Sequence, residues 1–170
     1  MRKSSGYFPV EDGPQPIVRS VKRAVRFEET DPIGVVWHGR YASYFEDARV
    51  MLTDSIGIGY FACYAATLLI PVTHMRLEFK IPMRYGDLVV ISAALHYTQA
   101  ARLHISYAIR NNGLLVCAGC TIQHFTDLNG NLCPARPAIY DNLCARWAAG
   151  KIPLDMQPYA MLAPAQATPA

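Results

Sequence analysis

The chain has 170 residues, enough for one domain with a single sizeable core, and 52% of them are apolar while 17% are charged. A net charge of +3 without a dense run of Lys and Arg argues against a nucleic-acid partner. No window of about 18 consecutive apolar residues predicts a membrane span. The apolar excess favours a further buried surface, such as a contact between subunits.

Composition divides the chain into three parts. Residues 1–19 contain three prolines and two glycines without periodicity, which predicts a flexible N-terminal arm. Residues 20–150 carry the periodic apolar patterns and predict one folded domain. Residues 151–170 are rich in Pro and Ala and predict a disordered tail.

The first half of the domain predicts one strand and one long helix. Residues 21–27 alternate as a strand does. From His38 to about Ile56 the apolar residues follow helical spacing, and Gly57 then stops the helix. Since this helix is apolar on most sides, we expect it to be buried.

The second half predicts four consecutive strands and a short helix. Residues 72–81 alternate between apolar and polar side chains, which is typical of a half-buried strand. Further strands are predicted at about 87–99, 101–111 and 114–126, with a hairpin turn at Asn112-Gly113 between the last two. A final short helix spans about 137–149. This element order predicts an α+β fold, in which a highly curved antiparallel sheet wraps around the long helix.

The segment between the first strand and the helix holds the most informative pattern. The strand is expected to break at Asp31-Pro32, turn through Gly34 and enter the helix near His38. A carboxylate beside the free N–H groups of a helix start suits hydrolysis of an acyl group, because those N–H groups stabilise a developing oxyanion. The alternative is that Asp31 only shapes a turn.

These residues belong to a wider set of motifs. The set comprises Glu29-Thr30-Asp31, Gly34, Val36, His38, Tyr41, Phe45-Glu46-Asp47-Ala48-Arg49 and Arg84-Tyr85-Gly86-Asp87-Leu88. With them the chain resembles hotdog-fold thioesterases, in particular the group of 4-hydroxybenzoyl-CoA thioesterase and YbgC-like acyl-CoA thioesterases. The resemblance covers roughly residues 20–148.

The resemblance implies a role for each matching position. Asp31 would be the catalytic carboxylate, either as nucleophile or as general base on water. The backbone N–H of His38 would bind the thioester carbonyl, with its side chain assisting. The substrate-binding residues would be Gly34, Val36, Trp37 and Tyr41. Trp37 and Arg40 depart from the family pattern and bear on the choice of acyl group.

The resemblance further implies an acyl-CoA substrate, with coenzyme A as part of that substrate and no metal or organic cofactor. Family members are homodimers or homotetramers with active sites between subunits. An acyl-carrier-protein thioesterase of fatty-acid or polyketide synthesis is the alternative enzyme. A non-catalytic acyl-CoA-binding module is the alternative from another class, and the presence of both Asp31 and His38 argues against it.

Other side chains are interpreted as structural. Glu46 and Arg49 are spaced to form an ion pair along one face of the helix. Cys117 and Cys120 lie three apart in a predicted strand, so their thiols point to opposite faces and cannot share a metal ion. The five cysteines lack the spacing of a disulfide framework and no signal peptide is expected, which favours reduced thiols in a cytoplasmic protein.

Overall fold

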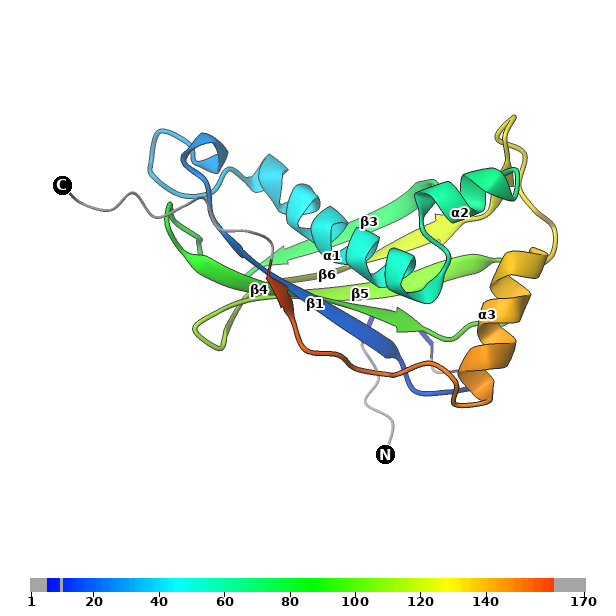
Figure 1. The fold of residues 1–170 in the computed structure, drawn as a ribbon. Coiled ribbons are helices and arrows are strands. Elements are labelled where there is room, and N and C mark those ends of the chain that lie inside the picture. The colour runs from blue at the N-terminus through cyan, green and yellow to red at the C-terminus, as the bar shows by residue number, and fades with distance from the viewer. Residues whose placement is uncertain (1–5, 10, 161–170) are drawn as a thin grey trace.

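Strands with alternating buried residues form the main sheet of the computed structural model, which describes residues 6–9 and 11–160 (Figure 1). Within these residues the strand order is β3-β6-β5-β4-β1-β8, antiparallel throughout except between β1 and β8. The strands are β1 (Ile17–Ala24), β3 (Val72–Phe79), β4 (Leu88–His96), β5 (Arg102–Asn111), β6 (Leu114–His124) and β8 (Tyr159–Ala160). A separate pair joins β2 (Leu68–Leu69) to β7 (Thr126–Asp127).

The long helix α1 (Tyr41–Ile56) runs across one face of the sheet (Figure 1). One side of the helix is buried, and the ring of Phe45 stacks on Tyr107 of β5 with 4.3 Å between ring centroids. Gly57 ends the helix in the left-handed conformation, as predicted. Helices α2 (Tyr60–Ala65) and α3 (Ala138–Ala148) follow later in the chain. The predicted α+β architecture is confirmed, and among the described residues no helix is long and apolar enough to cross a membrane.

The hairpin between β5 and β6 turns where the sequence predicts it. Asn112 and Gly113 have φ angles of 47° and 81°, the two left-handed residues that a tight hairpin turn requires. The strands on either side pair in antiparallel register. Local turn chemistry therefore sets this part of the sheet.

Two predicted strands differ from the structure. β1 begins at Ile17, earlier than the predicted start at Val21, and ends at Ala24, after which residues 27–29 form a 3-10 turn. β3 was expected to be half-buried, but it is an edge strand whose apolar side chains Met75 and Phe79 are 43% and 52% exposed. The cause is the position of α1, which packs chiefly over β1 and β4.

The two ends of the described chain contact the domain, so the folded region extends beyond residues 20–150. On the N-terminal side, the ring of Phe8 stacks on His104 with 4.4 Å between centroids. On the C-terminal side, Ile152 is buried and the Leu154 carbonyl accepts a 2.6 Å hydrogen bond from the Val18 N–H. This differs from the predicted flexible arm and disordered tail. The remainder of both predictions, residues 1–5, 10 and 161–170, lies outside the described residues.

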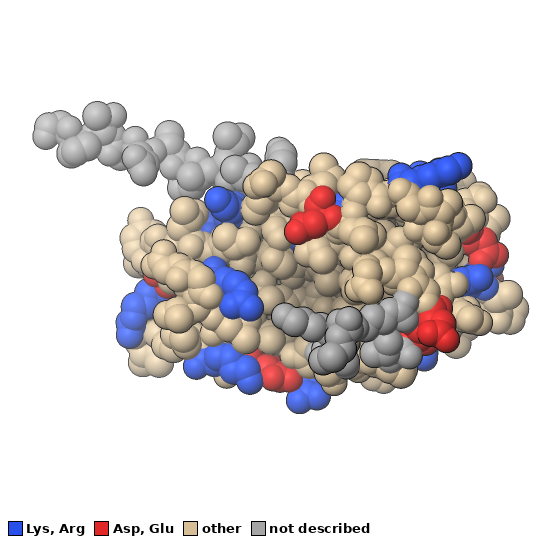
Figure 2. Space-filling model, turned by 90° about the horizontal axis from the view of Figure 1, so that it is seen from below, with Lys and Arg blue, Asp and Glu red and all other residues tan. Residues whose placement is uncertain are grey.

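Figure 2 looks onto the molecule from below, on the side of the sheet away from α1. Most side chains visible on this face are uncharged, and Lys, Arg, Asp and Glu gather largely toward its rim. The charged residues that matter for the candidate site lie on the other side, where β1 meets α1.

Candidate active site

Asp31 lies in a tight loop that its own carboxylate helps to close. Oδ1 accepts hydrogen bonds from the backbone N–H groups of Ile33 and Val35, at 3.0 and 3.4 Å. Gly34 has a φ of 78°, a conformation that glycine adopts without steric cost. Oδ2 has no hydrogen-bond partner among the described residues. Asp31 therefore shapes the turn with one oxygen and leaves the other available.

Backbone hydrogen bonds attach this loop to the segment that precedes β4. The N–H of Val36 donates to the Met83 carbonyl at 2.8 Å, and Nη1 of Arg84 reaches the Gly34 carbonyl at 3.5 Å. The Asp87 carboxylate in turn accepts a 2.8 Å hydrogen bond from the Arg84 N–H. The two sequence motifs that contain Asp31 and Asp87 are thus neighbours in space.

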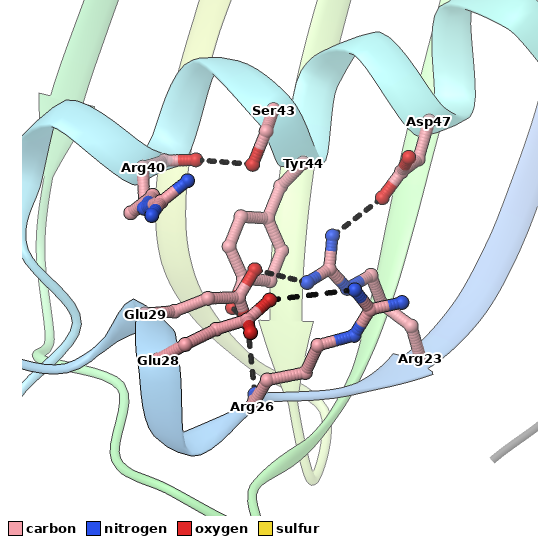
Figure 3. A network of polar contacts seen from close by, with 8 residues as sticks. All are labelled: Arg23, Arg26, Glu28, Glu29, Arg40, Ser43, Tyr44 and Asp47. Atoms are coloured by element: carbon pink, nitrogen blue, oxygen red, sulfur yellow. Dashed lines mark hydrogen bonds and ion pairs between the residues drawn. The ribbon is translucent and has the colours of Figure 1, made fainter. Parts of the chain in front are cut away.

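A buried network holds the segment immediately before Asp31 (Figure 3). Glu29 is 5% exposed, and its Oε2 accepts hydrogen bonds from the Tyr44 hydroxyl and the Arg26 N–H, both at 2.8 Å. Its Oε1 forms an ion pair with Arg23 of β1, which also binds Asp47 of α1 at 2.6 Å. The network therefore joins β1, the loop and α1 at one point.

These contacts determine the charge of Glu29. Burial acts to raise the pKa of the carboxyl, because it penalises the ionised form. The hydrogen bonds from Arg26, Tyr44 and Arg23 act in the other direction and hold the pKa of Glu29 below its ordinary value. Glu29 is thus an ionised structural residue, and burial together with this hydrogen bond raises the pKa of the Tyr44 hydroxyl far above its ordinary range.

At the start of α1, the backbone N–H groups of two residues, His38 and Gly39, have no hydrogen-bond acceptor among the described residues. His38, Gly39 and Arg40 form a 3-10 turn that continues directly into the helix. Within the described chain, neither His38 nor Gly39 donates a backbone hydrogen bond. Both residues are exposed. Unpaired N–H groups at a helix start are able to donate to a carbonyl oxygen, and this role of the His38 N–H stays a prediction.

A hollow of about 250 Å³ opens beside this helix start. It is lined by Val36, His38, Tyr41, Phe79, Lys80, Ile81 and Pro82. Its walls thus come from the start of α1 and the exposed end of β3. Tyr41 is 3% exposed and packs edge-to-face on Phe79 with 4.9 Å between centroids, so it contributes a firm apolar wall. Lys80 also lines the hollow, and its ammonium group forms a 3.0 Å ion pair with Glu78.

The structure brings some of the predicted site residues together and separates others. Val36, His38 and Tyr41 line the hollow, whereas Asp31, Gly34 and Trp37 are not part of its lining. The indole of Trp37 is 49% exposed and lies against Gly39, where a Cβ atom would approach it to 2.3 Å. Trp37 thus covers the backbone beside the candidate N–H donors.

Sequence reasoning missed the second donor and the network behind the loop. Gly39 gave no signal, because its role depends on the 3-10 turn. Glu29 stood in the recognised motif but received no role, since its partners Arg23 and Tyr44 come from two other elements.

The remaining candidates behave as structural residues. Glu46 and Arg49 form the predicted ion pair on α1. The five cysteines are unpaired, and the thiols of Cys117 and Cys120 stand three residues apart on β6 as expected. No group of three His, Cys, Asp or Glu side chains among residues 6–9 and 11–160 is arranged to hold a metal ion.

Comparison with known sequences finds a family match over most of the domain. The sequence model described as the thioesterase-like superfamily matches residues 25–143. A putative acyl-CoA thioesterase, YneP of Bacillus subtilis, is 29% identical over 51% of this chain and 63% of its own length. The chloroplastic acyl-acyl carrier protein thioesterase ATL3 of Arabidopsis thaliana is 32% identical over 52% of this chain and 47% of its own length. The chain therefore matches about half to two thirds of these relatives.

Comparison with solved structures supports the fold. A DHNA-CoA thioesterase from Staphylococcus aureus superposes with a TM-score of 0.70, covering 83% of this chain and 99% of the other at 24% identity. At this level of identity the likeness concerns the fold alone. It confirms the hotdog arrangement of a curved sheet around one helix.

Proposed function

Because the chain belongs to the thioesterase-like superfamily, we propose that it hydrolyses an acyl-CoA thioester to a free carboxylic acid and coenzyme A. The observation that carries this proposal is that, among the described residues, one carboxylate oxygen of Asp31 accepts no hydrogen bond and the nearby start of α1 has N–H groups that donate none. Water is the second substrate, and the proposed reaction draws on no metal or organic cofactor. Five unpaired cysteines fit the cytoplasmic location that we include in the proposal.

Asp31 is the proposed catalytic carboxylate. As a general base it takes a proton from water while the water oxygen attacks the thioester carbon, and the carbon–sulfur bond then breaks as the thiolate leaves. As a nucleophile it attacks that carbon itself, and water hydrolyses the resulting anhydride. In both routes the proton from water ends on the coenzyme A sulfur.

The helix start supplies the proposed oxyanion site. The N–H of His38, with that of Gly39 beside it, donates to the carbonyl oxygen as negative charge develops there. Such preorganised donors typically contribute 10²- to 10³-fold each in kcat. Val36, Tyr41 and the His38 side chain form the wall beside the reacting group, Gly34 keeps the loop backbone open, and Trp37 borders the acyl group.

We also propose that the active unit is a homodimer or homotetramer joined through β3. This edge strand exposes the side chains of Val72, Met75 and Phe79 next to its free backbone edge. An exposed apolar edge is a template for pairing with another strand. Since β3 also lines the hollow, a partner strand there would border the acyl site.

The name of one relative favours an alternative substrate, an acyl group on a carrier protein. Arg40 and Arg84 near the loop are exposed and provide a positive rim for an acidic partner, whereas Lys80 at the hollow is paired with Glu78. The chemistry at Asp31 is the same for both substrates, so only the choice of thiol carrier differs.

The test is thiol release from short, long and aromatic acyl-CoAs and from acyl carrier protein loaded with the same acyl groups. Asp31→Asn is compared with wild type, because the asparagine oxygen still accepts the loop hydrogen bonds. Asp141→Asn, which removes an exposed carboxylate on α3 paired with Arg136, is the matched control.

Turnover that falls at least 10³-fold in Asp31→Asn alone supports the proposal. Turnover retained in that variant removes Asp31 from its role and directs attention to Glu46. Release only from the carrier protein selects the alternative substrate. A folded wild-type protein that releases thiol from neither carrier contradicts the enzymatic proposal and leaves a binding module.

A further inference from the structure

Arg19 is a charged residue in a core position. It lies on β1 between Ile17 and Val21, which share its face of the strand and are 0% and 1% exposed. Arg19 itself is 3% exposed. Buried charges in proteins are nearly always paired with an opposite charge, because taking an ion out of water is costly.

Neutral oxygens, but no carboxylate, contact this guanidinium. Nε donates to the Ser55 hydroxyl at 3.0 Å, Nη1 to the Val18 carbonyl at 2.7 Å and Nη2 to the Pro153 carbonyl at 3.1 Å. These three bonds use three of the five N–H donors of the group. Within the described residues Arg19 forms no ion pair, although Asp155 is close enough to favour its charge.

A cavity of about 280 Å³ opens next to Arg19. Helix α1 contributes Met51 and Ser55 to its wall, and the C-terminal segment contributes Met156 and Pro158. That segment runs from α3 along β1 and holds its place through the hydrogen bond between Leu154 and Val18 (Figure 1). The cavity thus has one cationic wall and several apolar ones.

We propose that this cavity binds a small organic carboxylate, whose charged group pairs with Arg19 and whose short apolar chain lies against Met51, Met156 and Pro158. A planar guanidinium with two remaining donors suits the two oxygens of a carboxylate. The site lies at the C-terminal end of α1, whereas the candidate active site lies at its N-terminal end. The proposal does not depend on the thioesterase activity.

The Arg19 Nε–H signal in a proton–nitrogen NMR spectrum reports on the site directly. The full chain is titrated with sodium butanoate, and sodium chloride and 1-butanol serve as probes of ionic strength and of the apolar chain alone. We expect butanoate to shift the Arg19 signal until the shift saturates. We expect no saturable shift with sodium chloride or with 1-butanol. Failure of butanoate to move this signal at 50-fold excess over millimolar protein overturns the proposal.

Two variants on the exposed C-terminal segment keep the test independent of folding. Met156 is 52% exposed, so neither Met156→Glu nor Met156→Gln disturbs the core. Met156→Glu brings a carboxylate of the chain itself to the cavity, and we expect it to weaken butanoate binding at least 10-fold. Met156→Gln, of the same size but neutral, is expected to change binding less than threefold. Equal binding by both variants contradicts the assignment of the carboxylate to Arg19.

Arg19→Gln completes the series by removing the charge while keeping a hydrogen-bond donor. We expect its affinity for butanoate to be at least 10-fold lower than that of wild type. Because this variant lacks the Arg19 signal, the backbone signals of Met51 and Ser55 are used to measure binding. Lys22→Gln, which removes an exposed charge from the same strand, is the matched control and should bind as wild type does. If both variants bind alike, the anion is held by overall charge and not by this site.

Discussion

The hydroxyl of Tyr44 donates a 2.8 Å hydrogen bond to Oε2 of Glu29, and this buried contact fixes the segment that ends in Asp31 to helix α1. The same carboxylate binds Arg23, so three parts of the chain meet at Glu29. The ionised side chain of Glu29 therefore helps to hold the candidate catalytic loop beside the helix start.

We expect Glu29→Gln to lower the free energy of unfolding by about 3 kcal/mol, because it leaves the buried Arg23 guanidinium with only Asp47 as its partner. Urea unfolding at pH 7 measures this loss. Glu28→Gln is the control, since Glu28 pairs with Arg26 on the exposed surface at 3.6 Å and should contribute less than about 1 kcal/mol. Equal losses in the two variants would show that the network adds nothing to stability.

The role of the backbone at position 38 can be separated from that of the imidazole. We expect His38→Pro, which removes the N–H, to lower kcat 10²- to 10³-fold, and His38→Ala, which keeps it, to lower kcat much less. The preceding residue Trp37 has φ −59° and ψ 132°, a conformation that proline accepts in its neighbour. Circular dichroism checks that the proline variant is folded. A larger loss in His38→Ala would assign the catalytic effect to the side chain.

His104 makes stability depend on pH. Burial, together with the positive charge of Arg102, lowers the pKa of its imidazole to about 4, although Glu11 opposes this shift. The neighbouring His96 and His124 act in the same direction as Arg102. In the unfolded chain the pKa of a histidine is about 6.5.

Between about pH 4 and pH 6.5, His104 therefore binds a proton in the unfolded state but not in the folded state. The contribution is present in full above pH 6.5 and is lost as the pH falls toward 4. We expect about 2 kcal/mol lower stability at pH 5 than at pH 7.5 from this group alone. Urea unfolding of wild type, His104→Leu and the exposed control His74→Gln measures it. The prediction is contradicted if His104→Leu loses as much stability as wild type does between pH 7.5 and pH 5.

Local sequence patterns predicted those elements that depend on an uninterrupted apolar period or on turn residues. The 3.6-residue period over α1 and the Asn112-Gly113 turn were read correctly, because each depends on neighbouring residues alone. The start of β1 was read too late. Before Val21 its inward positions include Arg19, whose charge interrupts the apolar alternation that marks a strand.

Only the part of the candidate site that lies within one sequence motif could be predicted from the sequence. Asp31, Gly34 and His38 are close in sequence, so their loop could be derived from turn chemistry. The contacts of Glu29 with Arg23 and Tyr44 join a strand and a helix, and no sequence period records such a pairing. Tertiary contacts of this kind need the folded chain.

Exposure of β3 predicts how the protein assembles. We expect a mass that is a multiple of 18.9 kDa by light scattering, and we expect Met75→Lys to yield the monomer, because a charge on the β3 edge opposes strand pairing. Phe61→Lys is the control, since Phe61 is 83% exposed on α2 and is not part of β3. If the hollow beside β3 is completed by a partner, Met75→Lys also loses thiol release while its unfolding remains cooperative. A Met75→Lys protein that keeps the wild-type mass would place the subunit contact on another surface.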